Sequence, residues 1–435
     1  GAVVSTLRAS YPRADKSLLM ARHEVAFIVH GPGSAWQTPE AGLPPFTGLP
    51  VDEIAGRPPA ADALLPADEP GTPHDASGDL CLMSTTSGST GEKKSIALTH
   101  AEVLVRQSLD QKLWLPESRR LFVSLNFETS VAKALILRAL SIGNTLITST
   151  GSAANAFYEV LNRDRPTRIV TATGAIPHLV NLSVRTPEAA RLHEPTTASI
   201  CVTGSALPQA HLHWMMEHLG PNVEVQLGSS EASQTGFVDA RTLIERPDVS
   251  SLLLPWVHMQ AVDEAGRPLP AGQPGMLRVR SPGLARGYYR DPEATARVFR
   301  DGWFLSGDMG SVDEAGYVRL AGRANSVVNL GGAKINLERV ESLLGEHPGI
   351  VEAATLVVER GGLAGPALVA VVAPQAGIDK DGLTREITDL CATRLGAGHV
   401  PAVVLFTRAL PRNSGGKIER AALAQHVTPM FKRSP

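Results

Sequence analysis

Hydroxyl, glycine and lysine residues are concentrated in one short segment, residues 86–94 (TSGSTGEKK). Glycines let the backbone approach an anion closely, and hydroxyl and N–H groups donate hydrogen bonds to phosphate oxygens. Two lysines add positive charge, so the segment predicts a site for a polyphosphate. Gly88 and Gly91 are three residues apart, which matches neither the G-x-x-x-x-G-K-[ST] phosphate loop nor the G-x-G-x-x-G dinucleotide loop. A flexible surface turn rich in Ser and Gly is the alternative for this segment taken alone.

Around this segment, short apolar runs alternate with helical stretches from Leu80 onward. In the helix that we expect over residues 101–113, Val105, Leu109 and Leu113 recur at every fourth residue and share one face. The alternation of strands and helices predicts an α/β fold in which mostly parallel sheets are covered by helices. Buried strands are predicted at residues 121–123, 145–147, 168–170 and 199–202.

The two ends of the chain have a different character. Residues 25–29 form a strand-like apolar run, whereas residues 31–79 are crowded with Pro and Gly and predict irregular chain. Denser turns over residues 252–320 indicate a β-rich subdomain. We therefore expect a large domain over residues 1–324 and a small α+β domain over residues 325–435. In the small domain, helices are predicted near residues 337–346 and 382–395, and strands near residues 354–358, 368–373 and 402–406.

The composition excludes several classes of protein. A chain of 435 residues exceeds the ~250–300 residues that one core usually serves, which agrees with two domains. The formal net charge of −2 gives no broad basic field for nucleic acid or an anionic membrane. We expect neither a membrane span nor a signal peptide. Cys81, Cys201 and Cys391 form no C-x-x-C pair, so we expect no disulfide framework or cysteine zinc site, and a reducing, cytoplasmic compartment.

The segment at residues 86–94 resembles the [ST]-S-G-[ST]-T-G-x-P-K-G loop of the adenylate-forming superfamily. That superfamily contains acyl- and aryl-CoA synthetases, nonribosomal peptide adenylation domains, aryl acid–carrier protein ligases and luciferases. Lys93 replaces the usual Pro, Ser95 replaces the final Gly, and Lys94 falls on the family's lysine, which implies a catalytic role for Lys94. The resemblance also implies a large domain followed by a small mobile lid. ATP phosphates would be bound by Thr86, Ser87, Gly88, Ser89, Thr90 and Gly91.

Residues 227–231 (LGSSE) resemble the family's Y-G-x-T-E motif. The resemblance implies that Glu231 takes part in catalysis and holds Mg²⁺, a cation that prefers carboxylate oxygen. Leu227 replaces the aromatic residue that usually stacks on adenine, and we assign it to the substrate pocket. A lone solvated glutamate is the alternative for Glu231. The nucleotide contacts implied here are Gly228, Ser229 and Ser230.

Residues 302–308 (GWFLSGD) resemble G-W-x-x-T-G-D, which implies that Asp308 accepts hydrogen bonds from the ribose hydroxyls. An ordinary turn aspartate is the alternative for Asp308. Residues 322–325 (GRAN) resemble G-R-x-D. This resemblance implies that Arg323 contacts the ribose and that Asn325 is the hinge of the small domain.

Residues 329–335 (NLGGAKI) resemble the G-G-x-K-I loop, in which Gly331 and Gly332 would line a tunnel for the thiol. Residues 410–418 (LPRNSGGKI) resemble the family's L-P-x-T-x-x-G-K motif. Lys417 would bridge the acid carboxylate and the α-phosphate, where a cation stabilises the charge that develops during attack. Without the other motifs, a solvated loop lysine is the better interpretation of Lys417.

Residues 124–131 (SLNFETSV) correspond to the family's acid-pocket segment, and two alignments are open. One matches the F-D-x-S-V of amino-acid activators, so that Glu128 faces an α-ammonium group. The other matches the N-Y of aryl-acid activators, so that Asn126 bonds a ring substituent or carboxylate; packing in the core is the alternative for Phe127. Because Glu is one methylene longer than the usual Asp, we favour an aryl acid such as a hydroxybenzoate. The residues assigned to the substrate pocket are Asn126, Phe127, Gly204, Ser205 and Leu227.

The motifs together predict an AMP-forming acid–thiol ligase that uses ATP and Mg²⁺ and activates a carboxylic acid as an acyl-adenylate. The acceptor is coenzyme A or an acyl carrier protein. We favour the carrier protein, because no strong basic patch for the CoA 3′-phosphate stands out. About eighty residues precede the glycine-rich loop, fewer than the family usually has, so we expect a shortened N-terminal region.

Two other classes of function compete with a ligase. A non-catalytic sensor of nucleotide or acyl-adenylate is favoured by Leu227 and Asn325, but it would not need Lys417. The S-x-x-K spacing of Ser414 and Lys417 fits serine acylases, but the companion K-T-G motif is absent. The 13 histidines form no H-E-x-x-H motif, which argues against a metal-only hydrolase.

Overall fold

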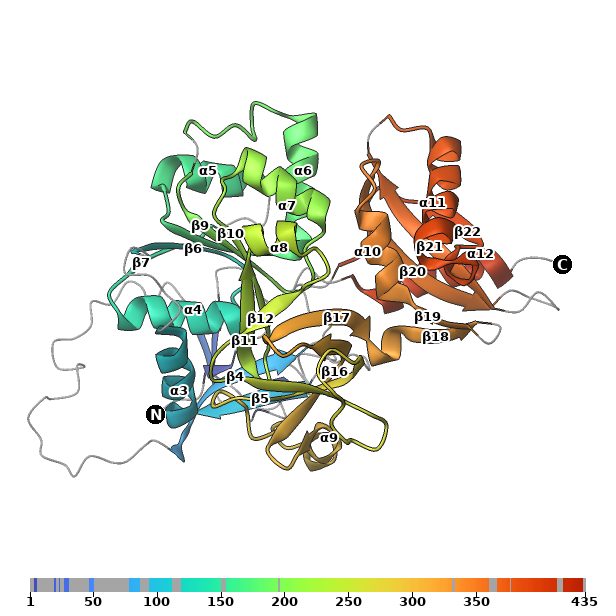
Figure 1. The fold of residues 1–435 in the computed structure, drawn as a ribbon. Coiled ribbons are helices and arrows are strands. Elements are labelled where there is room, and N and C mark those ends of the chain that lie inside the picture. The colour runs from blue at the N-terminus through green and yellow to red at the C-terminus, as the bar shows by residue number, and fades with distance from the viewer. Residues whose placement is uncertain are drawn as a thin grey trace, which may run out of the picture.

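The computed structural model describes residues 78–86, 94–111, 119–149, 154–194, 196–330, 333–359, 366–375, 377–412 and 418–432, together with short stretches before residue 51. These residues form a large sheet-rich domain and a small domain beside it (Figure 1). The arrangement confirms the predicted α/β fold class. None of the helices described has both the length and the apolar composition of a membrane span.

The centre of the large domain is a twelve-stranded sheet, and one half of it is parallel. The four buried strands expected from apolar runs are confirmed as neighbours in this half. Because parallel strands end at the same edge of a sheet, the loops that follow them gather there and form the usual place for a site. The parallel strands, in spatial order, are β7 (Thr145–Ile147), β6 (Arg120–Ser124), β8 (Arg168–Ala172), β9 (Ser199–Thr203) and β10 (Val223–Ser229).

The other half of the same sheet is antiparallel and begins where β10 turns back into β11. The β-rich subdomain expected over residues 252–320 corresponds to this half, which pairs strands far apart in the chain, such as β12 with β17. Its strands, in spatial order, are β11 (Ser233–Asp239), β12 (Ser251–Leu253), β17 (Tyr317–Arg323), β16 (Trp303–Val312), β14 (Gly275–Arg280) and β13 (His258–Val262), with β15 (Phe299–Arg300) beside β16.

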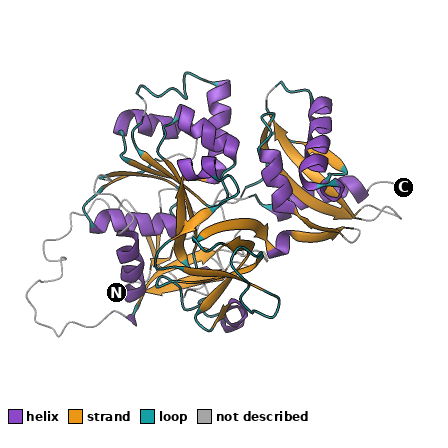
Figure 2. Cartoon of the chain, in the orientation of Figure 1, coloured by secondary structure: helices purple, strands orange, loops and turns teal. Residues whose placement is uncertain are grey.

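Helices cover both faces of the parallel half (Figure 2). Side chains alternate along each strand, so Ile169 and Ile200 pack against one group of helices while Val170 and Cys201 pack beneath α4. The first group is α5 (Ala154–Asp164), α6 (Ile176–Arg185) and α7 (Gln209–His218). The opposite face carries α3 (His100–Gln111) and α4 (Ser130–Ser141). The large domain also contains two shorter helices, α8 (Ala240–Glu245) and α9 (Pro292–Val298).

A second, smaller sheet carries the ends of the glycine-rich segment. β4 (Leu80–Thr86) leads into it and β5 (Lys94–Thr99) leads out, and the two strands pair antiparallel. β1 (Val4–Ser5) pairs with β4 in parallel. The run expected as a strand at residues 25–29 is observed as β2 (Phe27–His30). Its parallel partner β3 (Thr47–Pro50) lies inside the stretch predicted to be irregular, so that prediction is wrong for those four residues.

The small domain packs its helices on a three-stranded sheet, as expected from its apolar runs. Asn336 caps α10 by accepting hydrogen bonds from the N–H groups of Glu338 and Arg339, and Asp379 caps α11 in the same way. Along the chain, the last strand of the large sheet, β17, ends with Arg323, and the 3₁₀ turn η3 (Ala324–Ser326) follows. The three-stranded sheet of the small domain contains β20 (Ile350–Glu359), β21 (Pro366–Pro374) and β22 (Val403–Phe406). The remaining elements are β18 (Val327–Leu330), β19 (Ala333–Asn336), α10 (Leu337–Gly345), α11 (Lys380–Leu395) and α12 (Arg420–Lys432).

Candidate active site

The turn between β10 and β11 presents Glu231 at the carboxyl edge of the parallel strands. The ladder shifts register between Leu227 and Gly228, and Ser233 adopts a left-handed backbone with φ of 61°. A Cβ atom on Gly228 would lie 2.5 Å from the carbonyl oxygen of Ser233, so the close return of the chain requires glycine here. Ser229 closes the turn by accepting a hydrogen bond of 3.0 Å from the N–H of Ala232.

A buried arginine on α3 holds this turn in place. Arg106 donates from Nη1 to the carbonyl oxygen of Ser230 and from Nη2 to that of Glu231, both at 3.1 Å. Its Nε donates to the carbonyl oxygen of Gly283 at 2.9 Å. The guanidinium bonds the three carbonyl groups from three different nitrogens in one plane, whereas the donors of an ammonium group all radiate from a single nitrogen. Arg106 therefore fixes the backbone on which Glu231 is carried.

Tyr288 connects two of the motif segments, those that carry Glu231 and Lys94. Its hydroxyl donates to Oε1 of Glu231 at 3.0 Å, and the ammonium nitrogen of Lys94 lies 4.9 Å from the centre of its ring. Burial and the neighbouring Glu231 carboxylate raise the pKa of Tyr288, while the positive charge of Arg323 opposes the shift. The phenol therefore stays protonated and donates to the carboxylate. The N–H of Tyr289 donates to the carbonyl oxygen of Ser95 at 2.7 Å, which fastens this segment to β5.

Glu231 meets the requirements of a magnesium ligand. No group of three His, Cys, Asp or Glu side chains in the described parts of the chain could hold a metal ion alone. Mg²⁺, however, is commonly bound by one or two carboxylates together with substrate phosphates and water. One Glu231 oxygen is oriented by Tyr288, and the hydroxyl of the adjacent Ser230 bonds that of Ser130 at 2.7 Å. The donor set thus suits a hard cation that is shared with a polyphosphate.

Asp308 and Arg323 face each other across β16 and β17. Arg323 Nε lies 2.8 Å from Asp308 Oδ1, and Nη1 donates to the carbonyl oxygen of Ser306 at 3.1 Å. Both side chains are partly exposed, at 25% for Asp308 and 39% for Arg323. A partly exposed carboxylate beside a guanidinium can accept from vicinal hydroxyl groups, as the ribose assignment requires.

The start of the small domain is fastened to the end of β17 by α10. Glu338 accepts from the backbone N–H of Arg323 at 2.9 Å and from the hydroxyl of Ser326 at 3.0 Å. Asn336 donates from its side-chain amide to the carbonyl oxygen of Ala321. A Cβ on Gly322 would lie 2.6 Å from the Asn336 amide nitrogen, so the contact depends on glycine. We call this set of contacts around residues 321–326 the α10 clasp.

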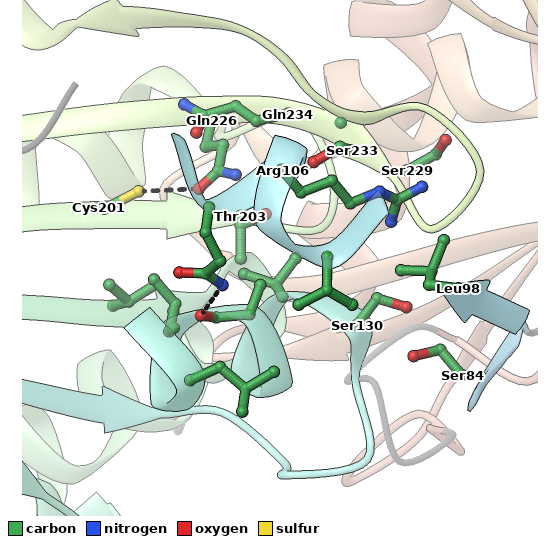
Figure 3. Close-up of a pocket in the computed structure, with 18 of the residues that line it drawn as sticks. Ser84, Leu98, Arg106, Ser130, Cys201, Thr203, Gln226, Ser229, Ser233 and Gln234 are labelled. Carbon is green, nitrogen blue, oxygen red and sulfur yellow. Dashed lines mark hydrogen bonds between the residues drawn. The ribbon is translucent and has the colours of Figure 1, made fainter. Parts of the chain in front are cut away.

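A pocket opens next to the Glu231 turn, between the sheet and the helices α3 and α4 (Figure 3). Its α4 wall is mostly apolar, and polar side chains from β8, β9 and β10 line the sheet side. Arg168 and Glu224 form an ion pair there, and the thiol of Cys201 lies 3.5 Å from Oε1 of Gln226. Burial raises the pKa of Cys201 to about 12, so this thiol is not a nucleophile at neutral pH.

The structure gathers some of the predicted site residues and leaves others apart. Gly228 and Ser229 line the pocket, whereas Asn126, Phe127, Gly204, Ser205 and Leu227 are not among its lining residues. Phe127 is 44% exposed, and Leu227 packs against the core of the antiparallel half. Thr86 ends β4, but its side chain is outside the described part, as is that of Asn325. The predicted residues that lie wholly outside the described residues are Ser87, Gly88, Ser89, Thr90, Gly91, Gly331, Gly332 and Lys417.

Residues 1–289 match the family described as AMP-binding enzyme, and residues 339–417 match the AMP-binding enzyme C-terminal domain. The chain belongs to the AMP-binding enzyme family. This assignment confirms the predicted adenylate-forming superfamily, and the protein is an AMP-forming acid–thiol ligase that binds ATP.

Other members of the AMP-binding family resemble the chain over most of its length. It is 29% identical to a 3-hydroxybenzoate–CoA ligase of Aromatoleum sp. (strain CIB), over 88% of this chain and 72% of that protein. It is 30% identical to a feruloyl-CoA synthase of Amycolatopsis sp., over 83% of this chain and 73% of that protein. The crystal structure of the anthranilate CoA ligase AuaEII with anthranoyl-AMP has the same fold, with a TM-score of 0.82 and 20% identity over 99% of this chain and 84% of that one.

Sequence motifs of the AMP-binding family did not reveal the residues that support the site. Arg106 and Gln107 are buried on α3, whereas Val105, from the apolar face expected for that helix, is 39% exposed. Tyr288 lies in the run Gly287-Tyr288-Tyr289, which weakly resembles the family's sequence and was the available signal for it. A charged or amide side chain can be buried when it donates its hydrogen bonds to backbone carbonyl groups, and a pattern of apolar residues does not predict this burial.

Proposed function

We propose that this protein activates an aryl carboxylic acid as its adenylate and transfers the acyl group to coenzyme A. The observation that carries the proposal is the meeting of Lys94 and Glu231 at Tyr288, from two separate motif segments, together with the Asp308–Arg323 pair. These side chains supply two cations and two carboxylates, and we take the pocket beside the Glu231 turn to be the acid pocket. Such a set can bind a polyphosphate and a ribose in one orientation.

In the first half-reaction, the acid carboxylate attacks the α-phosphorus of ATP in line, and pyrophosphate leaves. Lys94 and the residues of the glycine-rich segment hold the phosphates, and Asp308 and Arg323 hold the ribose. Glu231 and Ser230 would hold Mg²⁺, which supplies positive charge against the phosphate oxygens. We assign to Lys417 the contact between the carboxylate and the α-phosphate.

In the second half-reaction, the thiol loses its proton to water and its sulfur attacks the acyl carbon of the mixed anhydride. The bond from the acyl carbon to the phosphate oxygen breaks, and AMP leaves. We propose that the domain boundary lies at residues 324/325 and that rotation about Asn325 removes Lys417 and brings the loop of Gly331 and Gly332 to the site. A cytoplasmic location also remains a prediction.

The choice of coenzyme A departs from the preference for a carrier protein that the sequence suggested. The two relatives described above are named as a CoA ligase and a CoA synthase, and this similarity supports coenzyme A. The same names, which specify a hydroxybenzoate and a ferulate, support an aryl acid. The experiment supplies purified enzyme with coenzyme A or with a phosphopantetheinyl carrier protein. The thioester that forms shows which of the two is the acceptor.

The decisive experiment is acid-dependent exchange of pyrophosphate into ATP, followed by Lys417→Ala. We expect the variant to lose exchange by about 10²-fold or more, as for removal of a group that stabilises the transition state, while it still converts preformed acyl-adenylate and thiol to thioester. Lys380→Ala, at an exposed lysine at the start of α11, is the matched control. Equal loss of both half-reactions would contradict the assignment, and absence of exchange with every acid would favour a nucleotide sensor.

A further inference from the structure

The acid pocket contains polar side chains whose hydrogen bonds are mostly made within the protein. Ser130 bonds Ser230, the Arg168 guanidinium pairs with Glu224, and the thiol of Cys201 bonds Gln226. These groups shape the pocket, but their partners are already present. A group that lacks its partner is a better guide to the ligand, because buried polar atoms are normally satisfied.

Gln107 on α3 carries such an atom. The residue is 7% exposed and lines the pocket, and its side-chain Nε2 donates to the carbonyl oxygen of Ala134 at 2.9 Å. This bond fixes the orientation of the amide, since a carbonyl can only accept. The other atom, Oε1, is buried and accepts no hydrogen bond from any residue that the structure describes. Gln107 Oε1 is therefore an acceptor of fixed orientation that a donor on a bound ligand can reach.

The surroundings of Gln107 select a neutral donor. Arg106 precedes it, and Arg138 Nη1 donates to the Gln107 backbone carbonyl at 3.1 Å, so two guanidinium groups are close by. A substituent that carried its own positive charge would be repelled by both. The neighbouring wall, from Val103, Val131 and other apolar side chains, suits an uncharged hydrocarbon body.

We infer that Gln107 makes the enzyme selective for an acid whose apolar body carries an uncharged hydrogen-bond donor, a hydroxyl or an amino group. This inference rests on the proposed function, because it takes the pocket to be the acid site. The donor bonds Gln107 Oε1 when the acid excludes water from the pocket. An acid without the donor leaves the acceptor buried and unpaired, which is how a hydrogen-bonding site rejects an analogue.

The test compares acids that differ only in the donor. Pyrophosphate exchange is measured with benzoate, its three hydroxy, three amino and three fluoro derivatives, and with cinnamate and hexanoate beside their hydroxy derivatives. In the class of acid that supports exchange, we expect the best hydroxy or amino acid to exceed its unsubstituted parent in kcat/KM by about 10- to 100-fold. Among the benzoates, fluoro substitution at the same position gives no such gain, because fluorine is similar in size but donates nothing. The hydroxy and amino series distinguish the two sources of the donor.

The second arm removes the acceptor. In Gln107→Met, the preference for the donor-bearing acid falls to within about threefold, since the thioether is only a weak acceptor. Gln234→Met changes a second glutamine that lines the pocket, and there both acids change together so that their ratio is kept. Thermal unfolding of each variant shows that it is folded, and the comparison of acids with the unchanged enzyme stands even if Gln107→Met does not fold.

The results test three points separately: the role of Gln107, the requirement for an uncharged donor, and the ligase function. If unsubstituted or fluoro acids equal the donor-bearing ones at every position, or if folded Gln107→Met keeps the full preference, the inference about Gln107 is wrong while the ligase function stands. A cationic acid such as 4-(aminomethyl)benzoate that outperformed the neutral donors would overturn the requirement for an uncharged group. Exchange with no acid at all would overturn the proposed function, and the inference with it.

Discussion

The substitution Arg106→Met tests whether the Glu231 turn is held from α3. It removes three hydrogen bonds of 2.9–3.1 Å and takes this donor from the carbonyl groups of Gly283 and Ser230, whereas the carbonyl oxygen of Glu231 still accepts from the N–H of Ala285 at 2.8 Å. Bonds to a charged group contribute about 1.5–3 kcal/mol each, and burying the charge offsets part of that sum. We expect the free energy of unfolding to fall by about 3–5 kcal/mol, since each buried carbonyl group left without a donor costs about 1–3 kcal/mol.

The same substitution affects catalysis through the position of the Glu231 carboxylate. We expect kcat/KM for ATP in pyrophosphate exchange to fall by about 10²-fold, the effect typical of an ångström-scale misplacement at a reacting centre. Arg106→Lys keeps the charge and part of the hydrogen bonding, but its donors radiate from one nitrogen and do not match the geometry of all three carbonyl groups. Its loss in stability is therefore smaller, about 2 kcal/mol.

Denaturant unfolding gives the free energy of unfolding, and pyrophosphate exchange at varied ATP concentration gives kcat/KM for ATP. Arg185→Met, at an exposed arginine at the end of α6, is the matched control and should change stability by less than about 0.5 kcal/mol. Arg106 does not hold the Glu231 turn if Arg106→Met unfolds at the same denaturant concentration as that control, or if it keeps full exchange.

Three further predictions concern the turn, the tyrosine and pH. Gly228→Ala forces a Cβ to 2.5 Å from a carbonyl oxygen, so it should cost about 2 kcal/mol or more in urea unfolding, and a neutral result would mean that the turn adjusts freely. Tyr288→Phe removes the hydroxyl that orients Glu231 and should lower kcat/KM for ATP by about tenfold; an unchanged value would make the tyrosine purely structural. Burial, and then the charge of Arg412, lower the pKa of His211 to about 4. Only the unfolded chain binds this proton between the two pKa values, so the free energy of unfolding falls by about 2 kcal/mol from pH 7 to pH 5, and that loss should vanish in His211→Gln.

The strands of the parallel half could be predicted because each is a short apolar run buried on both faces. Runs such as residues 121–123 and 199–202 match β6 and β9 within a residue or two. The order of strands could not be predicted, because pairs such as β12 with β17 join segments distant in the chain. β3 was missed because its residues, Thr47–Pro50, include Gly and Pro, which are depleted in strands, and the structure shows them extended in parallel pairing with β2.

The candidate site divides in the same way. Glu231, Asp308 and Arg323 were singled out from motifs, and the structure pairs Asp308 with Arg323 and places Glu231 against Tyr288. Their roles toward phosphate and ribose stay predictions. Arg106 and Gln107 could not, because their roles depend on which carbonyl groups lie opposite α3 after folding. Apolar periodicity favoured the face of Val105, which is partly exposed, and gave no sign that the polar residues beside it are buried.

The α10 clasp has a consequence for exchanging parts between relatives. A cut at residues 324/325 would separate the end of β17 from Glu338 and Asn336, which bind the Arg323 N–H and the Ala321 carbonyl oxygen. A graft that imports a foreign small domain therefore also replaces the groups that hold the backbone of Arg323. Chimaeras joined after residue 339 keep the first turn of α10 with its own strand, and they should inherit this chain's nucleotide affinity more faithfully than those joined at the turn itself.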